Sequence, residues 1–502
     1  MAKVQKSPLL SDGNFDVKEV IELSFFDLTG DTAKTKGTSN KSYHAELHVA
    51  KKGSKAQIYS MWGPTGGSQT RDWRHYDTFE KAKKDFDKIV KNKKRKGYVE
   101  VDVAQRAYGS TEAKKITKAV VLTGGDDIKK DAPKSLLPEP TQELLHTLFG
   151  STAQFVATTL KCPLGQLTNA QIDKGREYLD DAKRIVNKKR VTKKDREKIA
   201  DLTNAFYATI PHNLGTGSRG QMTQLLLDDL DKIMGKEDDL DTLLDAKSVG
   251  AALNVDAQVD AQYKELNADL EWLDHVSDEF QFLSEYFMKS KVRHHGYETA
   301  RVKNIWRVER KDEASDYFMS NAERIASECG KHHFVKETAW LNKNVVRWTP
   351  DKRPDLDKKL RKLYNDANVW ICWHGTRSAN VVGITKRGLL VRPAGAVHTG
   401  SMYGDGKYFA WQSTKSLNYT DGGYWTGGRS SNSSRFMFGL DVALGNMHIA
   451  PRSHFYRCAP SGTHSMYGKA RSSGVLNDEM ITYDFNKKDT QSRIRYLFEI
   501  TD

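Results

Sequence analysis

The stretch Trp373-His374-Gly375-Thr376 decides the fold expected for the C-terminal part of the chain. It includes the end of the apolar run Trp370-Ile371-Cys372-Trp373, which is typical of a buried strand. This strand would lead directly into His374. A lone histidine after an aromatic strand is usually structural, so the chemistry has to be sought in the stretches that accompany it.

Two stretches downstream complete the pattern. Residues 408–419 read YFAWQSTKSLNY, and residues 477–484 read NDEMITYD. In the second stretch Glu479 precedes Met480-Ile481-Thr482-Tyr483, a strand-like run that would hold the carboxylate rigidly. A tyrosine alone is more often a core or edge aromatic, and one glutamate before a strand says little. Their joint order and spacing carry the information.

These stretches together resemble the catalytic domain of the poly(ADP-ribose) polymerases, enzymes that cleave NAD+ and transfer ADP-ribose. The order of His374, Tyr408 and Glu479 matches that family, and so does the S-x-x-S-x-x-Y pattern of residues 413–419. The resemblance implies NAD+ as the substrate. The His–Tyr–Glu set is the version associated with chain elongation rather than with single transfer.

The chemistry implied by NAD+ requires few groups. The bond to be cleaved joins a ribose carbon to a positively charged nicotinamide, so the leaving group needs no strong general acid. The site has to grip the nicotinamide and to supply negative charge as the sugar becomes oxocarbenium-like. One carboxylate held close to the ribose meets that need, as it does at a glycosidic centre. Glu479 is the candidate.

The resemblance also implies how the nicotinamide is held. The backbone N–H and C=O of Gly375 would bind the carboxamide, with the Ser416 hydroxyl as a further donor. Tyr419 would stack on the nicotinamide ring, and Tyr408 would pack on its other side. These four residues form the expected nicotinamide side of the NAD+ site.

The ribose contacts follow from the same resemblance. His374 would bind a ribose hydroxyl on the adenosine side, with Thr376 nearby, and Glu479 would bind the 2′-hydroxyl of the nicotinamide ribose. Lys415 would lie close to Glu479 and favour its ionised form.

Several positions depart from the family pattern. Thr376 stands where the DNA-dependent members usually carry serine, although the hydroxyl is kept. Ser401 replaces a frequent aromatic, and Leu390 stands where some members have an arginine that contacts adenosine; Arg392 lies two residues on. The departures concern the adenosine side and leave the nicotinamide side largely intact.

The bulk composition fits a multidomain globular protein. The chain has 502 residues, of which 38% are hydrophobic and 29% charged, enough for two to four domains. It contains no apolar run long enough to span a membrane and no apolar segment of a secretory signal at the N-terminus. The net charge of +14 favours a polyanionic partner such as nucleic acid, with a solvated basic surface as the alternative.

The cysteine pattern predicts a reducing compartment and no metal. Four cysteines are scattered over the whole chain, which argues against a disulfide framework. Cys329 with His332 and His333 lacks a second pair of ligands at a zinc-like spacing.

The N-terminal part predicts a small β-rich domain with one helix. Alternating patterns predict strands over residues 20–26, 41–49 and 56–62, with a hairpin at residues 52–54, and a helix follows from Phe79. Together with Tyr59-x-x-Trp62-Gly63, this region resembles the WGR domain of the same polymerases, although Pro64 stands in place of the name-giving arginine.

That resemblance implies contact with DNA ends, and the alternative is a protein-facing or purely structural role. The expected DNA-binding residues are Trp62, Lys93, Lys94 and Arg95, since lysine and arginine supply affinity for phosphates that does not depend on sequence. The basic run 93–96 also resembles a nuclear localisation cluster, or is a solvated helix end.

A helical pattern occupies residues 141–289. Thr168-Asn169-Ala170-Gln171 is a capping box, Gly235 is a candidate helix end, and residues 263–287 predict a single long helix. Residues 163–172 and 201–212 resemble the helical regulatory domain of the polymerases, which restrains the NAD+ cleft until DNA binds. Such a switch needs a bundle that opens locally; a rigid scaffold is the alternative.

The expected architecture is multidomain α+β. From residue 297 onward many strands and few helices predict a mixed α+β transferase domain, with an irregular span at 311–362 and a mobile loop at 422–434. The expected parts are a flexible N-terminus (1–15), a WGR-like domain (16–105), a linker (106–138), a helical regulatory domain (139–290) and a catalytic domain (291–502).

The function expected from the resemblance is an NAD+-dependent poly(ADP-ribose) polymerase that is activated by DNA breaks and modifies itself and other proteins. A mono-ADP-ribosyltransferase and a DNA-binding scaffold with a silent transferase fold are the alternatives. The expected partners are DNA with strand breaks, protein acceptors and an accessory factor that completes the active site; the expected location is the nucleus in a eukaryote and otherwise the cytoplasm.

Overall fold

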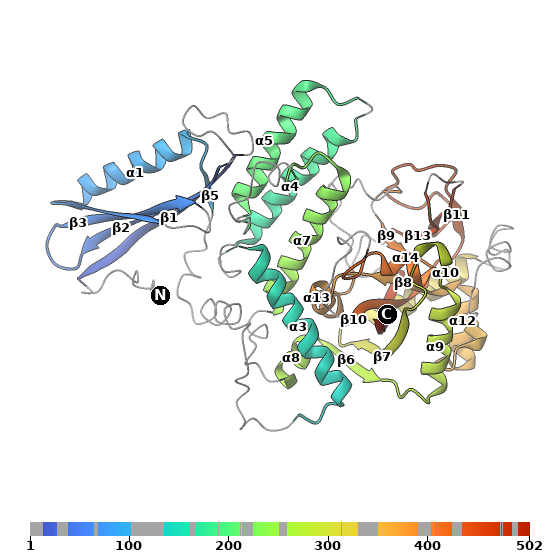
Figure 1. Ribbon diagram of the computed structural model, residues 1–502. Coiled ribbons are helices and arrows are strands. Elements are labelled where there is room, and N and C mark those ends of the chain that lie inside the picture. The colour runs from blue at the N-terminus through green and yellow to red at the C-terminus, as the bar shows by residue number, and fades with distance from the viewer. Residues whose placement is uncertain are drawn as a thin grey trace. The chain divides into compact units, whose positions relative to one another are not determined.

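The chain divides into two compact units. The computed structural model describes residues 14–27, 39–64, 69–101, 135–160, 167–188, 190–210, 212, 224–249, 259–312, 314–329, 350–389, 403–404, 406–423, 434–471, 473, 475–483 and 490–502 (Figure 1). The first unit comprises residues 1–128 and 153–256, and the second comprises residues 129–152 and 257–502. The flexible segment expected before residue 14 and most of the expected linker lie outside the described residues.

The first unit contains an antiparallel sheet with the strand order β4-β3-β2-β1-β5. Its strands are β1 (Phe15–Asp27), β2 (Ser39–Ala50), β3 (Ala56–Pro64), β4 (Thr70–Tyr76) and β5 (Val99–Val101). The strands expected at 20–26, 41–49 and 56–62 and the hairpin at Gly53 are confirmed. The hydrophobic pattern does not predict β4, because polar residues outnumber its two large aromatics.

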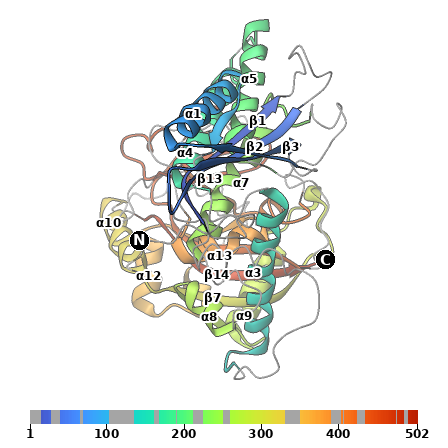
Figure 2. The same ribbon diagram turned by 90° about the vertical axis from the view of Figure 1, so that its left-hand side faces the viewer.

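One helix covers one face of this sheet. Helix α1 (Phe79–Arg95) lies along the strands, as Figure 2 shows, and is capped by the Thr78 side chain. Its buried residues Ala82 and Phe86 pack against apolar side chains that alternate along the strands, including Ala45, Leu47 and Ile58. Alternation of buried and polar residues with period two explains why these strands could be predicted.

The other helices that the structure describes in this unit are α4 (Asn169–Val186), α5 (Lys193–Thr209) and α7 (Leu230–Val249). The boundary between the two units falls within α3 (Glu139–Thr159). The capping box at Thr168 is confirmed. The helix end expected at Gly235 is wrong, since α7 continues for fourteen residues beyond it to Val249; a Cβ at this position would meet open space. Helix α5 packs on β1, where the Phe26 and Tyr207 ring centroids are 5.0 Å apart.

The second unit contains two sheets. The five-stranded sheet has the order β6-β7-β14-β10-β8, and the four-stranded sheet has the order β11-β12-β13-β9. The strands are β6 (Ala268–Trp272), β7 (Arg301–Arg310), β8 (Val369–Gly375), β9 (Lys407–Phe409), β10 (Ser434–Ala443), β11 (Met447–Ile449), β12 (Ser465–Gly468), β13 (Glu479–Thr482) and β14 (Ser492–Thr501).

Helical segments surround these sheets. They are α8 (Val259–Glu265), α9 (Asp278–Lys289), η3 (Arg293–His295), α10 (Ala314–Cys329), η4 (Pro350–Lys352), α12 (Lys358–Asp366), α13 (Ser378–Arg387) and α14 (Ser413–Leu417). Helix α9 buries Leu283, Tyr286 and Phe287 against the five-stranded sheet. None of the helices within the described residues is long and apolar enough to cross a membrane.

Two expectations for this unit are wrong. The long helix expected over residues 263–287 is interrupted by β6, which pairs with β7, and Asn267 at φ 52° ends α8 in the left-handed conformation. Leucines at three-residue and four-residue steps fit a helix, but Leu270 also alternates with polar neighbours and pairs as a strand. The span expected to be irregular, 311–362, contains α10 and the start of α12. Many charged residues in this span make the apolar faces of the two helices hard to recognise in the sequence.

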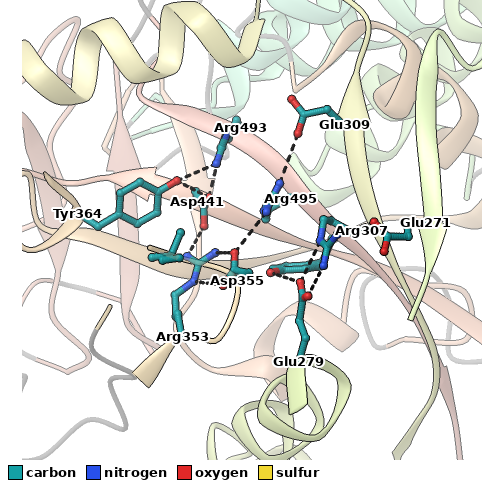
Figure 3. A network of polar contacts seen from close by, with 12 residues as sticks. Glu271, Glu279, Arg307, Glu309, Arg353, Asp355, Tyr364, Asp441, Arg493 and Arg495 are labelled. Carbon is teal, nitrogen blue, oxygen red and sulfur yellow. Dashed lines mark hydrogen bonds and ion pairs between the residues drawn. The ribbon is translucent and has the colours of Figure 1, made fainter. Parts of the chain in front are cut away.

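A buried ionic network fixes one side of the five-stranded sheet (Figure 3). Arg353 Nη1 lies 2.5 Å from Asp441 Oδ1, and Arg353 Nη2 lies 2.7 Å from Asp355 Oδ2. Tyr364 donates to the other Asp441 oxygen at 2.8 Å, and Arg493 Nε contacts that oxygen at 3.2 Å. Burial alone would raise the pKa of Asp441, but the guanidinium charges, Arg353 first, hold it at about 2. The network therefore joins the segment that follows η4 to α12, β10 and β14 through paired charges.

Candidate active site

Strand β8 brings His374 and Gly375 to the junction of the two sheets. It pairs with β10, and an isolated bridge joins Trp373 to Ala410 just after β9. The Trp373 side chain is completely buried, stacks on Tyr286 at 5.1 Å and donates to Ser290 Oγ at 3.1 Å. The end of β8 is therefore held on both sides of the chain.

Gly375 lies directly against α14. A Cβ added at Gly375 would stand 1.8 Å from the carbonyl oxygen of Ser416, so no larger residue fits without movement. Figure 1 shows α14 beside β8. Ser416 is buried on this helix, and Tyr419, two residues beyond its end, is 37% exposed. The glycine, the serine and the tyrosine that the sequence singles out thus occur in one small region.

His374 is held as a neutral ring. Its Nδ1 lies 3.3 Å from the Tyr408 carbonyl oxygen, which can only accept a hydrogen bond, so Nδ1 carries the proton and Nε2 is the acceptor. Burial lowers the pKa of His374, and the bond to the carbonyl opposes that effect only partly. Thr376 is buried, and its hydroxyl accepts from Asn380 at 3.0 Å.

Tyr408 and Glu479 share one face of the pair formed by β9 and β13. Tyr408 lies opposite Ile481, and Glu479 is two residues from Ile481, so the three side chains point to the same side. The Tyr408 hydroxyl donates to the Gly404 carbonyl and accepts from Tyr403 N, both at 3.0 Å. The tyrosine ring is therefore fixed by the loop that precedes β9.

The Glu479 carboxylate is paired with Lys415. Lys415 Nζ donates to Glu479 Oε1 at 2.8 Å and to the Asp478 carbonyl oxygen at 3.0 Å. The two side chains are 9% and 16% exposed, so the pair is largely shielded from water but not completely buried. Among the residues that the structure describes, none bonds the other Glu479 oxygen, which leaves that oxygen for a ligand; the carboxylate matches the negative charge that an oxocarbenium-like sugar requires.

Some supporting residues have no signal in the sequence. The Asp478 carboxylate accepts from Trp411 Nε1 at 2.7 Å and from Ala470 N at 2.8 Å, which fixes the start of β13. His295 bridges Thr414 Oγ1 at 2.8 Å and Asn477 Oδ1 at 2.9 Å, and so ties η3 to both catalytic stretches. The two His295 contacts join residues more than a hundred positions apart, and Trp411 is 67 positions from Asp478, so only the folded chain reveals them.

Three predicted adenosine-side positions, Ser401, Leu390 and Arg392, lie outside the described residues. Among the residues that are described, no group of three or more histidine, cysteine, aspartate or glutamate side chains is arranged to hold a metal ion. The expectation that the reaction needs no metal stays a prediction.

The expected DNA-binding residues differ in their surroundings. Lys93 Nζ lies 3.9 Å from the Tyr43 ring centroid and 5.0 Å from that of Tyr98, and Tyr43 stacks on Trp62 at 6.0 Å. Lys94 forms an ion pair with Glu100. Trp62 and Lys93 therefore belong to one cluster of rings around a cation, whereas the Lys94 ammonium is paired with a carboxylate.

Comparisons with known proteins agree with this arrangement. The family model of the poly(ADP-ribose) polymerase catalytic domain matches residues 277–495, the model of the polymerase regulatory domain matches residues 135–270, and the WGR domain model matches residues 28–105. The chain therefore belongs to the poly(ADP-ribose) polymerase family. The exact domain boundaries expected from the sequence stay predictions.

The matches cover very different shares of the individual relatives' lengths. The chain is 28% identical over 352 residues to poly(ADP-ribose) polymerase 1 of Danio rerio, a match that covers 68% of this chain but only 29% of the relative. It is 24% identical over 542 residues to poly(ADP-ribose) polymerase 2 of Homo sapiens, covering 99% of this chain and 82% of the relative. The chain thus covers less than a third of the Danio relative and most of the human one.

Proposed function

We propose that this chain is an NAD+-dependent poly(ADP-ribose) polymerase that DNA breaks activate. It transfers ADP-ribose to itself and to other proteins, extends the attached ADP-ribose into a polymer, and releases nicotinamide. The observation that carries the proposal is the shielded Lys415–Glu479 pair on the same face as Tyr408, in a member of this family.

In the proposed reaction each residue has one role. Gly375 and Ser416 bind the carboxamide, and Tyr408 and Tyr419 enclose the nicotinamide ring. The acceptor nitrogen of His374 takes a hydrogen bond from a ribose hydroxyl on the adenosine side, near Thr376. These contacts hold NAD+ in one orientation before the bond to nicotinamide breaks.

Glu479 acts at the reacting sugar. Its carboxylate accepts from the 2′-hydroxyl of the nicotinamide ribose and stabilises the positive charge that grows as nicotinamide leaves with the bonding electrons. The departing ring becomes neutral, so the step needs no proton from the protein. Lys415 is a positioning residue, because it binds Glu479 Oε1 and leaves the other oxygen for the ribose.

Product analysis tests the proposal. The full chain is incubated with labelled NAD+ with and without nicked DNA, and both nicotinamide release and product size are measured. A ladder of long products that appears or grows with nicked DNA is expected. A single unit per acceptor would identify a mono-ADP-ribosyltransferase instead, and no turnover under either condition would identify a scaffold with a silent transferase fold.

The proposed DNA contact centres on Lys93. Burial, followed by the charges of Lys96 and Lys41, lowers the pKa of Lys93 to about 8. An anionic phosphate would favour the charged form of the Lys93 ammonium. Above pH 8, where Lys93 is largely neutral, DNA binding would therefore require Lys93 to take up a proton. This cation lies next to Trp62 through Tyr43 and supports a role for the cluster at a DNA end, even though Pro64 replaces the family's arginine.

The pH dependence of DNA binding tests this role. Affinity for nicked DNA is measured from pH 7 to 9, and the wild type is expected to weaken by up to about tenfold per pH unit above 8. Lys93→Arg, which keeps its charge, should remove most of that loss, while Lys94→Arg should behave as the wild type. An identical pH profile for all three proteins would contradict the role of Lys93.

The partners and the location also belong to the proposal. DNA with strand breaks, acceptor proteins and an accessory factor that completes the active site are the proposed partners. The net charge of +14 supports a polyanionic partner. The nucleus is the proposed location in a eukaryote, and otherwise the cytoplasm.

A further inference from the structure

A strip of exposed cations and rings follows β11. Residues 452–457 read RSHFYR; Arg452, His454 and Arg457 are exposed, and Phe455 is 39% exposed. Neither Arg452 nor Arg457 has an ion pair or a hydrogen bond from its side chain within the part of the chain that the structure describes. The Tyr456 ring packs against the His454 ring at 5.0 Å. We call residues 452–457 the basic-aromatic strip.

The sheet topology places the start of this strip at the end of the four-stranded sheet where Glu479 begins β13. Strands β11 and β12 are parallel, so their C-terminal ends lie at the same end of the sheet. Gly468, the last residue of β12, pairs directly with Glu479, the first residue of β13. The segment between β11 and Arg452 therefore starts at the same end of the sheet as the proposed catalytic carboxylate.

Tyr403 links the strip to the active site. Tyr456 N donates to the Tyr403 carbonyl oxygen at 3.3 Å, and Gly404 forms a bridge with Tyr456. Tyr403 N in turn donates to the Tyr408 hydroxyl at 3.0 Å. Burial and then the charge of Glu479 raise the pKa of Tyr403, which agrees with its position near that carboxylate.

Close backbone approaches hold this link rigidly. Gly404 has φ 91°, and a Cβ there would stand 1.9 Å from the Tyr456 carbonyl oxygen. A Cβ at Gly468 would stand 2.5 Å from the Tyr403 ring. The strip is therefore anchored through Tyr456 to the segment of Tyr403 and Gly404 that precedes β9.

The strip suits a polymer that alternates charged phosphates with flat bases. A guanidinium binds phosphate oxygens through two parallel hydrogen bonds, and aromatic side chains stack on successive bases of a flexible strand. Acidic peptides would satisfy Arg452 and Arg457 but would leave Phe455 without a ring to stack on. A chain of ADP-ribose supplies both a pyrophosphate and an adenine in every unit.

We propose that the basic-aromatic strip binds the ADP-ribose polymer as it leaves the adjacent active site. The inference rests on the proposed function, because that reaction produces the polymer at Glu479. Arg452 and Arg457 hold pyrophosphates of the growing chain, and Phe455 stacks on an adenine. The strip keeps the product near the site between additions and so favours long chains without taking part in bond cleavage.

Direct binding tests the proposal without any turnover. Purified poly(ADP-ribose) of defined length is titrated with the full chain in the absence of NAD+, with nicked DNA in excess to occupy the DNA-binding surface. Arg452→Ala/Arg457→Ala should weaken binding about tenfold and lower the slope of log affinity against log salt by about 1.4, at about 0.7 for each lost phosphate contact. Phe455→Ala should weaken binding at least about fivefold.

A matched control removes two cations elsewhere. Lys358 and Lys359 on α12 are exposed and have no ion pair within the described residues. Lys358→Ala/Lys359→Ala changes the net charge equally and should bind the polymer as the wild type does. Equal losses in both double variants, or no loss in the arginine variant, would overturn the proposal.

Two further outcomes separate the competing explanations. Single-stranded DNA of matched charge also carries phosphates and bases but lacks the pyrophosphates that Arg452 and Arg457 are proposed to hold, so it should compete poorly for the strip. Competition as strong as that of the polymer would show a general nucleic-acid surface and overturn the proposal. With NAD+, the arginine variant should release nicotinamide at the wild-type rate but make shorter polymer, and unchanged polymer length would contradict the proposal. A wild-type chain that makes no polymer refutes the proposed function, while the titration still decides whether the strip binds polymer.

Discussion

Gly375 is a residue at which this fold permits little change. The carbonyl of Ser416 occupies the space that a side chain would need, so the close approach of β8 and α14 depends on the missing Cβ. The same approach brings the backbone of residue 375 and the hydroxyl of Ser416 within one small region. The packing constraint and the proposed carboxamide contact therefore fall on a single position.

Gly375→Ala should impair both stability and NAD+ binding. The added methyl group has to displace α14, and overpacking of this kind costs about 1–3 kcal/mol or more. The free energy of unfolding, from urea titration, and the KM for NAD+ are the measurements. Gly235→Ala is the control, since a Cβ there meets open space inside α7, and it should raise stability by about 0.5–1 kcal/mol. A Gly375→Ala variant with unchanged stability and KM would contradict this description of the site.

Strand β2 shows how one element carries two different faces. Ala45 and Leu47 belong to the core under α1, while His44, Glu46 and His48 alternate with them on the other face. His44 pairs with Glu22 and lies 2.7 Å from Glu46, which lies 2.6 Å from His48. Burial alone would lower the pKa of His44, but the bonds and charges of Glu22 and Glu46 outweigh it and raise that pKa to about 9.

This network of side chains should make the free energy of unfolding depend on pH. The pKa of His44 is above its unfolded value of about 6.5, so its contribution is complete below pH 6.5 and is lost as pH rises through 9. His44→Gln should remove this dependence, which is on the order of 3 kcal/mol in the wild type. Urea midpoints of the full chain between pH 6 and 9.5 are the measurement, with the exposed His75→Gln as control.

The low-pH side follows from Glu46. Burial alone would raise its pKa, but bonds to His44 and His48 hold it at about 2, so its contribution is present above pH 4.5 and is lost as pH falls through 2.

Groups facing His44 also include Gln57, through His48, and the Tyr59 ring. Equal slopes above pH 6.5 for the wild type and the His44→Gln variant would show that the network does not titrate.

Local sequence predicts those elements in which one period dominates. Period two identifies β1, β2 and β3, and the capping box marks the start of α4, because each signal lies within a few residues. It fails at β6, where Leu266, Leu270 and Leu273 satisfy a helical period while the pairing with β7 decides the outcome. Long-range pairing overrides local preference in such short segments.

The candidate site divides in the same way. Resemblance to a family identifies His374, Tyr408 and Glu479, and the pairing of Lys415 with Glu479 is found at 2.8 Å. The residues that fix them, such as Trp411, contribute through contacts distant in sequence and have no motif. The roles proposed for these residues in catalysis stay predictions until kinetics test them.

At the largest scale, the second unit contains buried paired charges in addition to its apolar core. Arg353, Asp355 and Asp441 are at most 2% exposed, and together with Tyr364 and Arg493 they connect distant elements (Figure 3). Buried charges are tolerated only when every partner is present. The network is therefore a point at which one substitution affects the entire unit.

Arg353→Met should be strongly destabilising. It leaves the Asp441 and Asp355 carboxylates buried without their main partner, which costs about 3–5 kcal/mol. Lys362→Met on α12 breaks an exposed ion pair with Asp366 and should cost no more than about 0.5 kcal/mol. Urea unfolding of both variants is the measurement; equal, small losses would show that the network is not a major source of stability.

The account of function depends on the carboxylate of Glu479. The most direct measurement compares labelled products from the wild type, Glu479→Gln and the control Glu265→Gln, which loses a partly buried ion pair with Lys386. With NAD+ and nicked DNA present, Glu479→Gln should make no long polymer, bind NAD+ within about threefold of the wild type, and differ from the control, which should elongate normally. Polymer of normal length from Glu479→Gln would show that elongation does not depend on the Glu479 carboxylate.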